Sequence, residues 1–320
     1  MILLLGATGY IGNAFQEELE QRGENFHALS RTQLDYTHFE QLYPYLRENK
    51  PSFIVNAAGY TGKPNVDACE SAKADTLQGN ALFPQVLASA CAALDIPWGH
   101  VSSGCIFSGC QVETGQGWVV AKDMTDPEIR NIAKKSPARI RGFDETMTPN
   151  FSFRDQPCSF YSGTKALGEE SIRGVGRNYI WRLRIPFDEQ DNSRNYLSKI
   201  QRYAKVYDNF NSLSHRRDYV SACLNTWAQK IPFGTYNITN PGFVSTADVL
   251  KKIETILKPD RDFHFWENDS EFYSQAAVAP RSNCIMDTSK LLNAGIKMRS
   301  VDEALEQSLN QWQYEKAKEG

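Results

Sequence analysis

The sequence predicts an α/β protein with a doubly wound parallel sheet and a smaller C-terminal lobe. Short apolar segments recur through the first 186 residues, each is followed by a segment with helical periodicity, and a glycine-rich turn follows the first of them. Strands that alternate with helices of this length are typical of βαβ units, whose strands run parallel. Beyond residue 186 the alternation becomes irregular. We therefore expect one domain over 1–186 and a second lobe over 187–320.

The individual elements follow from the same patterns. Residues 1–5 are a continuous apolar run, as expected for a strand at the buried centre of a parallel sheet. Further strands are expected at 26–30, 53–57, 98–102 and 179–185. Helices are expected at 13–22, 38–49, 72–94 and 162–172, and then near 195–206, 218–230, 246–257 and 301–315.

One connection in the first part is unusually long. Residues 109–142 link a strand to a helix, and we expect them to be irregular except for a helix at 127–135. A connection of this length usually carries a function or forms an interface.

Composition excludes several classes of protein. The net charge is −3, which gives no electrostatic reason to expect binding to nucleic acid or to an anionic membrane. The first apolar run is too short for a signal segment or a membrane span. The seven cysteines are scattered without a C-x-x-C pair, which indicates reduced thiols, so we expect a cytoplasmic protein. The five histidines form no spaced cluster, so we expect structural or surface roles and no metal site.

The glycine-rich turn indicates a nucleotide site. Gly6-x-x-Gly9-x-x-Gly12 directly follows the first strand and opens a helix. Glycines at these positions let backbone N–H groups approach a pyrophosphate at the helix N-terminus. An ordinary glycine-rich turn is the alternative, and the strand–turn–helix context favours the dinucleotide site of a Rossmann-type fold. The other expected cofactor contacts in this turn are Thr8, Tyr10 and Ile11.

The end of the second strand indicates which dinucleotide binds. A protein that prefers NAD usually has an acidic residue there, whereas this chain has Ser30-Arg31. A guanidinium can hold the 2′-phosphate of NADP, so the sequence favours NADPH over NADH. The alternative for Arg31 is a solvated surface arginine. Asp35 could contact the adenine, or it could form a turn.

Two more strand ends fall on the same edge of the sheet. Asn56, Ala57, Ala58 and Gly59 are small enough for a cofactor to lie against their backbone. Ser103 could hydrogen-bond a substrate oxygen, or it could satisfy a loop backbone. Pro186 marks a turn expected near the nicotinamide, at the end of the last predicted strand of the first domain.

Tyr161-Ser-Gly-Thr-Lys165 is the strongest catalytic signal. Residues four apart lie on one face of a helix. A phenol titrates near 10, so acid/base work at neutral pH requires a cation that stabilises the phenolate. Lys165 can supply that cation and can also hold a cofactor ribose. By chance such a pair is common, but here it follows the glycine turn and Ser103 in order.

These motifs together resemble a known family. The order GATGYIG, NAAG, SSGCIF, YSGTK and RLRIP resembles extended short-chain dehydrogenase/reductases. Longer strings resemble the nucleotide-sugar 3,5-epimerase/4-reductases that make deoxysugars such as rhamnose, which are related to dTDP-4-dehydrorhamnose reductase and GDP-fucose synthase. These strings lie at 56–67, 104–107, 194–200, 236–242 and 278–283. The resemblance extends from residue 1 to about residue 312.

The resemblance implies a reaction and a set of residues. Ser103, Tyr161 and Lys165 match the reductase triad, in which NADPH gives hydride to a C4 ketone while the tyrosine protonates the oxygen. Cys105 and Lys199 match the acid/base pair that inverts C3 and C5. If the strand continues past Ser103, Cys105 points to the same side as Ser103. The expected contacts with a nucleotide-diphosphate sugar are Lys63, Asn65, Ser103, Cys105, Asn195, Lys199 and Arg281.

The chain departs from the family pattern at two places, and three other functions stay open. Residues 109–142 are longer than the family pattern, and the string at 216–219 resembles other extended members. The alternatives are a reductase without epimerase activity, a 4,6-dehydratase, and an inactive cofactor-binding regulatory subunit. A dehydratase needs an acidic pair where this chain has Gly104-Cys105, and the intact triad argues against an inactive subunit. The nucleotide base, the sugar and the oligomeric state are left open, and a homodimer is compatible with the sequence.

Overall fold

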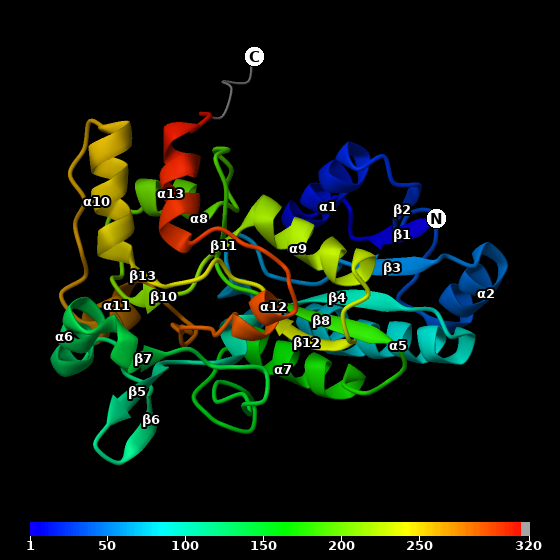
Figure 1. Cartoon of the computed structure of the whole chain (residues 1–320), viewed down its shortest axis with the longest axis horizontal. Coiled ribbons are helices and arrows are strands. Elements are labelled where there is room, and N and C mark those ends of the chain that lie inside the picture. Colours follow the sequence, from blue (N-terminus) through cyan, green and yellow to red (C-terminus); the bar gives the residue numbers. More distant parts are fainter. Residues whose placement is uncertain (315–320) are drawn as a thin grey trace.

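The computed structural model describes residues 1–314 and contains a six-stranded sheet in which all neighbouring strands pair parallel (Figure 1). The strand order is β12-β8-β4-β3-β1-β2. The strands are β1 (Ile2–Leu5), β2 (Phe26–Leu29), β3 (Phe53–Asn56), β4 (Trp98–Ser103), β8 (Asn178–Leu183) and β12 (Gly234–Asn237). This arrangement confirms the predicted fold class.

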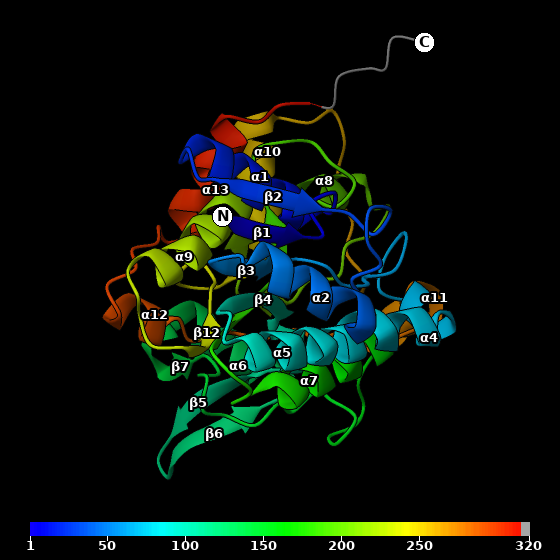
Figure 2. The same ribbon diagram turned by 90° about the vertical axis from the view of Figure 1, so that its right-hand side faces the viewer.

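Helices cover both faces of this sheet. Helices α1 (Tyr10–Gln21) and α9 (Arg216–Ala228) lie on one face, and α2 (Phe39–Asn49), α5 (Phe83–Leu94) and α7 (Phe160–Ile172) lie on the other (Figures 1 and 2). Strands between two helical layers must be apolar on both sides, and every residue of β1 is buried.

A second group of helices lies at one end of the molecule in Figure 1. Helices α8 (Tyr196–Arg202), α10 (Thr246–Leu257) and α13 (Val301–Asn310) share an apolar cluster that includes Leu197, Val249 and Leu305. By contrast, α9 and β12 follow residue 186 in sequence but belong to the layers of the main sheet. The chain therefore returns to the sheet after it has left it, and a division at residue 186 stays a prediction.

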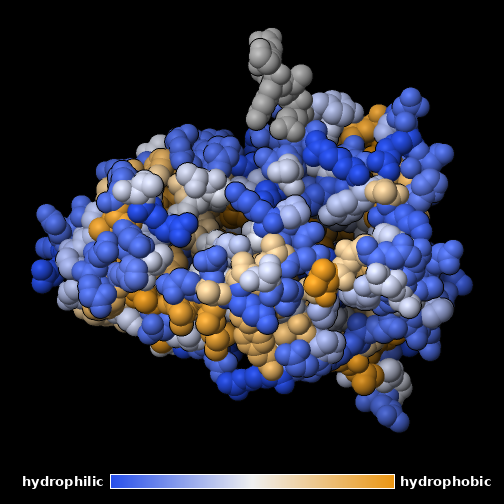
Figure 3. Space-filling view, turned by 180° about the vertical axis from the view of Figure 1, so that it is seen from behind, coloured by the Kyte–Doolittle hydropathy of each residue, from blue (hydrophilic) through white to orange (hydrophobic). Residues whose placement is uncertain are grey.

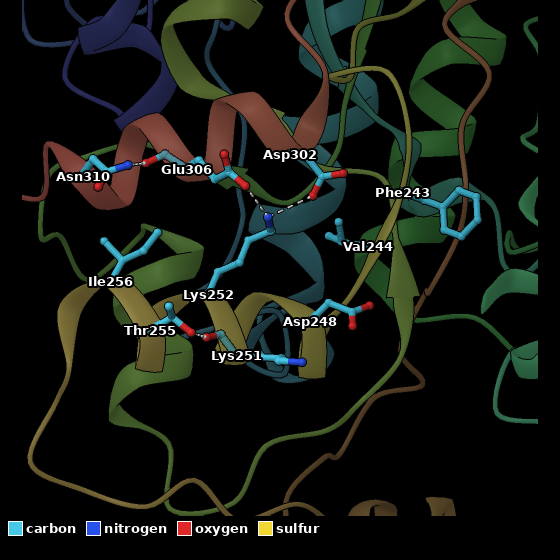
Figure 4. A pocket seen from close by; sticks show the side chains of 10 residues that line it. All are labelled: Phe243, Val244, Asp248, Lys251, Lys252, Thr255, Ile256, Asp302, Glu306 and Asn310. Carbon is cyan, nitrogen blue, oxygen red and sulfur yellow. Dashed lines mark hydrogen bonds and ion pairs between the residues drawn. The ribbon is translucent and has the colours of Figure 1, made fainter. Parts of the chain in front are cut away.

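Helices α10 and α13 start at capping boxes and are joined by an ion bridge. In both helices the N-cap serine, Ser245 or Ser300, exchanges hydrogen bonds with an acidic residue three positions later. Lys252 on α10 lies 3.3 Å from Asp302 and 2.8 Å from Glu306 on α13 (Figure 4). The groove between the two helices is lined by these ion-paired groups and contains none of the predicted site residues.

The segment 109–142 is more ordered than the sequence suggested. It contains β5 (Cys110–Thr114), β6 (Gly117–Ala121), α6 (Pro127–Lys135) and β7 (Ile140–Arg141). The three strands form an antiparallel sheet in the order β6-β5-β7. The helix at 127–135 is confirmed, but the expectation of irregular structure around it is wrong. The sequence offered no long alternating run, because the outer strand is short and most of its residues are exposed.

The β5–β6 hairpin projects from the molecule at the lower left of Figure 1 and the lower right of Figure 3, where orange side chains mark apolar residues. Trp118, Val119 and Val120 on β6 are all exposed. Because consecutive strand residues point to opposite faces, both faces of this edge strand present apolar groups.

Other elements differ from the expectation in their bounds. The helix expected at 72–94 is divided into α3 (Ala68–Ser71), α4 (Lys73–Leu77), a π-helical turn (Gln78–Leu82) and α5. The strand expected at 179–185 ends at Leu183, because Ile185 has a φ of +38° that a strand cannot accommodate. The chain then forms β9 (Pro186–Phe187), which pairs with β11 (Ser214–His215).

The remaining α-helices and strands are short. They are β10 (Phe210–Asn211), β13 (Val244–Ser245), α11 (Asp269–Gln275) and α12 (Ser289–Asn293). Within residues 1–314 there is no helix that combines the length and the apolar character needed to cross a membrane.

Candidate active site

The site lies at the carboxyl edge of the main sheet, where the strand order reverses. From β1 the chain moves outward to β2 and then crosses to β3 on the other side of β1. A crevice opens at such a switch point, and ligands of doubly wound folds bind there. The turn after β1 is packed against the turn after β3, since a Cβ on Gly6 would lie 2.5 Å from the Ala58 nitrogen. Gly6 also has a φ of +79°, so both the close approach to Ala58 and the backbone conformation require glycine at this position.

The N-terminus of α1 fits an anionic group. Gly9 is the N-cap, no side chain caps the helix, and the first turn contains no acidic residue. Thr8 and Gly9 are exposed, while Ile11 is half-buried. At Gly12 a Cβ would lie 1.9 Å from the Gly6 oxygen, so only glycine allows the helix to start this close to the turn. The free N–H groups at this helix end suit the pyrophosphate of a dinucleotide.

The Tyr10 side chain lies against Arg216, the first residue of α9. The Arg216 guanidinium lies 4.7 Å from the centre of the Tyr10 ring and donates from its Nε to the Tyr10 carbonyl oxygen at 2.9 Å. Arg216 also pairs with Asp188 at 2.8 Å and donates to Asn13 at 2.7 Å. The Tyr10 ring is thereby packed between α1 and α9, and a contact of Tyr10 with a cofactor stays a prediction.

Arg31 is available to a ligand at the end of the second strand, while Ser30 and Asp35 are engaged locally. Arg31 is exposed and has no hydrogen bond or ion pair among residues 1–314. Ser30 hydrogen-bonds the side chains of Thr32 and Gln33, each at 2.8 Å. Asp35 accepts a 2.6 Å hydrogen bond from the Thr37 hydroxyl, which is the main factor that lowers its pKa. This geometry favours the turn alternative for Asp35.

The turn after β3 lies close to the side chain of Lys165. Asn56 is buried, accepts from the Ala58 nitrogen at 3.0 Å and lies 3.1 Å from His100 Nδ1. Ala57 and Ala58 are half-buried and Gly59 is exposed. A Cβ on Gly59 would lie 3.4 Å from the Lys165 Nζ, so a larger residue there would crowd the ammonium group.

The three residues of the predicted triad come together. Tyr161 lies in the first turn of α7, and Lys165 follows one turn later. Lys165 is buried, and its Nζ donates to the Val101 oxygen at 3.3 Å. Ser103 is the last residue of β4 and is also buried. It is near enough to Tyr161 to act on the pKa of the phenol.

Burial determines the protonation states of Lys165 and Tyr161. It lowers the pKa of Lys165 to about 8, against the opposing effects of Cys105 and Glu169. Burial raises the pKa of Tyr161, and the Ser103 hydroxyl acts in the opposite direction. At neutral pH the tyrosine is therefore a neutral proton donor and the lysine is mainly a cation.

A buried ion pair that we did not predict stands behind the triad. Glu169 lies one turn beyond Lys165 on α7, and Arg182 on β8 donates to it at 2.7 Å. Ser102 on β4 donates to the same carboxylate at 2.6 Å. Both charged residues are almost fully buried, so the pair fixes α7 against two strands. An arginine within the otherwise apolar strand NYIWRL was the available signal.

Cys105 joins the triad by a different path from the one we expected. The strand ends at Ser103, and Gly104–Ile106 form a 3₁₀ turn whose Cys105 nitrogen donates to the Ser103 Oγ at 3.2 Å. The condition that the strand continues past Ser103 is therefore not met, and the orientation inferred from it does not apply. The thiol is buried, which raises its pKa, while hydrogen bonding with Ser103 and the charges of Arg184 and Lys165 lower it.

Lys199 is free of internal partners. It lies on α8, is half-buried, and makes no side-chain hydrogen bond or ion pair within residues 1–314. Burial, followed by the charge of Arg194, lowers its pKa. Its position across a sugar ring from Cys105 stays a prediction.

The structure corrects the predicted substrate contact of Asn195. This residue is fully buried and caps α8, accepting from the Leu197 nitrogen at 3.0 Å. Its Nδ2 donates to Asp188 at 2.9 Å and to the Gln190 oxygen at 2.7 Å. Because the amide is buried and engaged on both its oxygen and its nitrogen, it cannot contact a substrate, and its role is to hold α8.

The other predicted substrate contacts lie in two loops joined by an ion pair. Arg281 binds both carboxylate oxygens of Asp67, at 2.7 and 2.6 Å. Asn65 accepts from the Asp67 nitrogen at 2.8 Å, and Lys63 in the same loop is exposed. Pro186 is half-buried at the start of β9. Contacts of these residues with a ligand stay predictions.

Comparison with other proteins places the chain among sugar-nucleotide enzymes. Residues 1–132 match the family described as RmlD substrate binding domain. The chain is 32% identical over 305 residues to the bifunctional dTDP-4-dehydrorhamnose 3,5-epimerase/dTDP-4-dehydrorhamnose reductase of Arabidopsis thaliana, covering 95% of this chain and 90% of the relative. It is also 32% identical over 305 residues to a trifunctional UDP-glucose 4,6-dehydratase/UDP-4-keto-6-deoxy-D-glucose 3,5-epimerase/UDP-4-keto-L-rhamnose-reductase of the same plant. This second alignment also covers 95% of this chain, but the chain spans only 41% of the length of that relative.

Solved structures share the fold. The L780 UDP-rhamnose synthase of Acanthamoeba polyphaga mimivirus aligns over 97% of this chain and 98% of its own, with a TM-score of 0.80 and 24% identity. The dTDP-4-dehydrorhamnose reductase of Bacillus anthracis, in complex with NADP, aligns over 97% of both chains with a TM-score of 0.73 and 20% identity.

Proposed function

Because the chain belongs to the family of dTDP-4-dehydrorhamnose reductases and their bifunctional epimerase/reductase relatives, we propose that it is an NADPH-dependent enzyme of rhamnose-type deoxysugar synthesis. Its substrate is a 4-keto-6-deoxy nucleotide sugar, which it epimerises at C3 and C5 and reduces at C4. The observation that carries this proposal is the meeting of Ser103, Tyr161 and Lys165 beside the glycine turn at the switch point of the sheet.

The triad residues suit the reductase step. Bound NADPH supplies the hydride that reduces the C4 ketone. Tyr161 gives its proton to the C4 oxygen as negative charge develops there, and the Ser103 hydroxyl holds that oxygen in place. The Lys165 ammonium, close to Gly59 and one helical turn from Tyr161, stabilises the phenolate that remains.

The preference for NADPH rests on Arg31. This side chain is exposed and unpaired at the end of β2, where the 2′-phosphate of NADP lies in folds of this type. Ser30 and Asp35, the other two residues predicted near this end of the cofactor, are engaged in local turns. The guanidinium of Arg31 is therefore the group that distinguishes the two cofactors.

The epimerase step rests on Cys105 and Lys199. The C4 ketone acidifies the protons at C3 and C5, so a base can remove one while the electron pair moves to the ketone oxygen. An acid on the opposite face then returns a proton to the carbon, and the configuration is inverted. A thiol and a lysine whose pKa is lowered by burial can fill these two roles.

The same site disfavours a dehydratase. The positions after Ser103 are Gly104 and Cys105, where a dehydratase would place its acidic pair. The relatives act, by their names, on UDP- and dTDP-linked sugars, and they resemble this chain equally. A cytoplasmic location and a homodimer stay predictions.

A panel of substrates tests the proposal. The protein is assayed with NADPH and the UDP-, dTDP- and GDP-linked 4-keto-6-deoxy sugars in deuterated water, and the products are identified by NMR. We expect NADPH oxidation with at least one sugar and deuterium at C3 and C5 of its product. Absence of NADPH oxidation with every sugar would overturn the reductase. Reduction without deuterium incorporation would leave a reductase and remove the epimerase.

A further inference from the structure

Arg184 is a buried cation without an anionic partner. It follows β8, is 6% exposed, and lies two residues beyond Arg182, whose charge is matched by Glu169. No carboxylate of residues 1–314 lies within ion-pair distance of Arg184, and its Nε has no hydrogen-bond partner although it is fully enclosed. A buried charge normally has a counter-charge, because its removal from water is costly.

Neutral groups hold this guanidinium in place. One of its terminal nitrogens donates to the Asn211 Oδ1 at 2.6 Å and to the Ser282 carbonyl oxygen. Asn211 itself donates to Asn283 at 3.1 Å. The orientation of Arg184 is therefore fixed while its charge is left uncompensated, as in a site prepared for an anion that is present only part of the time.

The same contacts lead from Arg184 to the turn that carries Cys105. The Asn211 Oδ1 also accepts from the Cys284 nitrogen at 3.0 Å, and the Cys284 thiol donates to the Gly104 oxygen at 3.3 Å. Gly104 directly precedes Cys105 in the 3₁₀ turn. In agreement with this path, the Arg184 charge acts on both the Cys105 thiol and the Tyr161 phenol.

We propose that Arg184 is the counter-ion of the Cys105 thiolate, an inference that rests on the proposed epimerase role of that cysteine. Whether Cys105 accepts a proton from the sugar or returns one to it, it is a thiolate in one of its two states. The proton moves between sulfur and carbon, and no oxidant or reductant is needed. Arg184 matches the charge that this exchange leaves on sulfur, so it is a positioning residue that acts through Cys105.

Several other groups surround the thiol and must be considered in any pH experiment. The cations are Arg184 and Lys165, and the remaining neighbours can lose a proton or hydrogen-bond the thiol. These neighbours are Ser103 from β4, Tyr161 and Ser162 from α7, Cys158 before α7, Cys69 from α3 and Cys284 after α11. Lys165 donates to the Val101 oxygen and serves Tyr161, whereas Arg184 has only neutral partners, which leaves Arg184 as the cation available to the thiolate.

The test measures the reactivity of Cys105 rather than turnover. The rate of alkylation of Cys105 by iodoacetamide is followed from pH 6 to 10 by peptide mass spectrometry, in the full chain with and without NADPH. In Arg184→Met we expect the reaction at neutral pH to slow about tenfold, because loss of an adjacent opposite charge shifts a titration by roughly one unit or more. Arg184→Lys, which keeps a charge, should retain most of the wild-type rate.

A second variant keeps Arg184 and gives its guanidinium a carboxylate partner. Asn211→Asp has the same shape as asparagine and places a carboxylate against the Arg184 guanidinium. Once paired with this carboxylate, Arg184 can no longer balance the charge of the thiolate. The variant should therefore shift the pKa of Cys105 in the same direction as Arg184→Met does. Asn211→Asp also decides the question if Arg184→Met does not fold.

The outcomes separate this inference from the proposed function. An unchanged pH profile of Cys105 in folded Arg184→Met, or in Asn211→Asp, would overturn the role of Arg184 whether or not the enzyme epimerises its substrate. A wild-type enzyme that incorporates no deuterium at C3 and C5 would instead overturn the epimerase. Folding is checked by thermal unfolding. Cys91 and Cys223 are 1% and 0% exposed, compared with 7% for Cys105, and serve as internal references of lower accessibility.

Discussion

The two sides of the site are built on opposite plans. On the sheet side the groups suited to bind an anion are left open, because the N-terminus of α1 has no side-chain cap and Arg31 makes no hydrogen bond or ion pair within residues 1–314. On the lobe side most polar side chains are engaged by other protein groups. Asn195 uses its amide to hold α8, and Arg281 is paired with Asp67. Lys199 is the exception on that side.

This difference has a physical origin. A dinucleotide is bound largely by backbone groups of one continuous turn, so the residues around it need only be small and leave the helix end free. The lobe is assembled from short, separate segments that must first be fixed to one another. Its polar residues do this work, and only a few remain for a ligand.

The largest expected effect belongs to the sheet side. Tyr161→Phe keeps the ring but removes the proton donor, so turnover should fall about 10²–10⁴-fold. NADPH should still bind, because the glycine turn and Arg31 are untouched, and this is measured by the fluorescence of the bound cofactor. A Phe variant with full activity would show that the triad is assigned to the wrong residue.

The next prediction sharpens the contrast within the lobe. Asn195→Ala removes the α8 cap and leaves buried Asp188 without its amide partner, so the free energy of unfolding should fall by about 2–3 kcal/mol. Lys199→Ala removes a side chain without internal partners and should leave the free energy of unfolding nearly unchanged.

Chemical denaturation of both variants provides the measurement, with deuterium exchange at C3 and C5 as the second readout. Lys199→Ala should abolish exchange but still reduce a 4-keto sugar that is supplied already epimerised. If Asn195→Ala were as stable as the wild type and lost only substrate affinity, our correction of its role would be mistaken.

The sheet side could be predicted from the sequence better than the lobe side. The glycine turn, the proximity of Tyr161 and Lys165, and the parallel sheet could be predicted because each depends on local rules: a tight turn, a spacing of four on a helix, continuous apolar strands. The engagement of Asn195 by Asp188 could not be found in this way, because hydrogen-bond partners within the lobe depend on how its segments pack. The hairpin at 110–121 was missed because its outer strand is exposed on both faces and lacks an alternating pattern.

Cofactor choice tests whether the open groups of the sheet side act on a ligand. Arg31→Ala should narrow the preference for NADPH over NADH by about 1–3 kcal/mol, the usual strength of a charge-assisted hydrogen bond. Arg177→Ala is a control for the loss of an arginine far from the site, because this exposed arginine, which pairs with Asp95, directly precedes β8 and so lies at the opposite edge of the sheet. Equal use of both cofactors by the wild-type enzyme would contradict the role of Arg31.

The smallest expected effect concerns the protonation of Lys165 on the sheet side of the site. Only the ammonium form of Lys165 can stabilise the Tyr161 phenolate, and its pKa is lowered by burial to about 8. The protonated fraction therefore falls as the pH rises through that value. The kcat/KM for NADPH, which reports the free enzyme, should decline about tenfold per pH unit above it.

Lys165→Arg provides the control for this pH dependence. A guanidinium stays charged throughout the accessible range, so the variant should lose the alkaline decline even if its overall rate is lower. Burial moves the pKa of Tyr161 upward, away from this window, so the tyrosine does not produce the same decline. If the decline persists in Lys165→Arg, another group titrates there. The open side of the site would then be governed by a residue outside the triad.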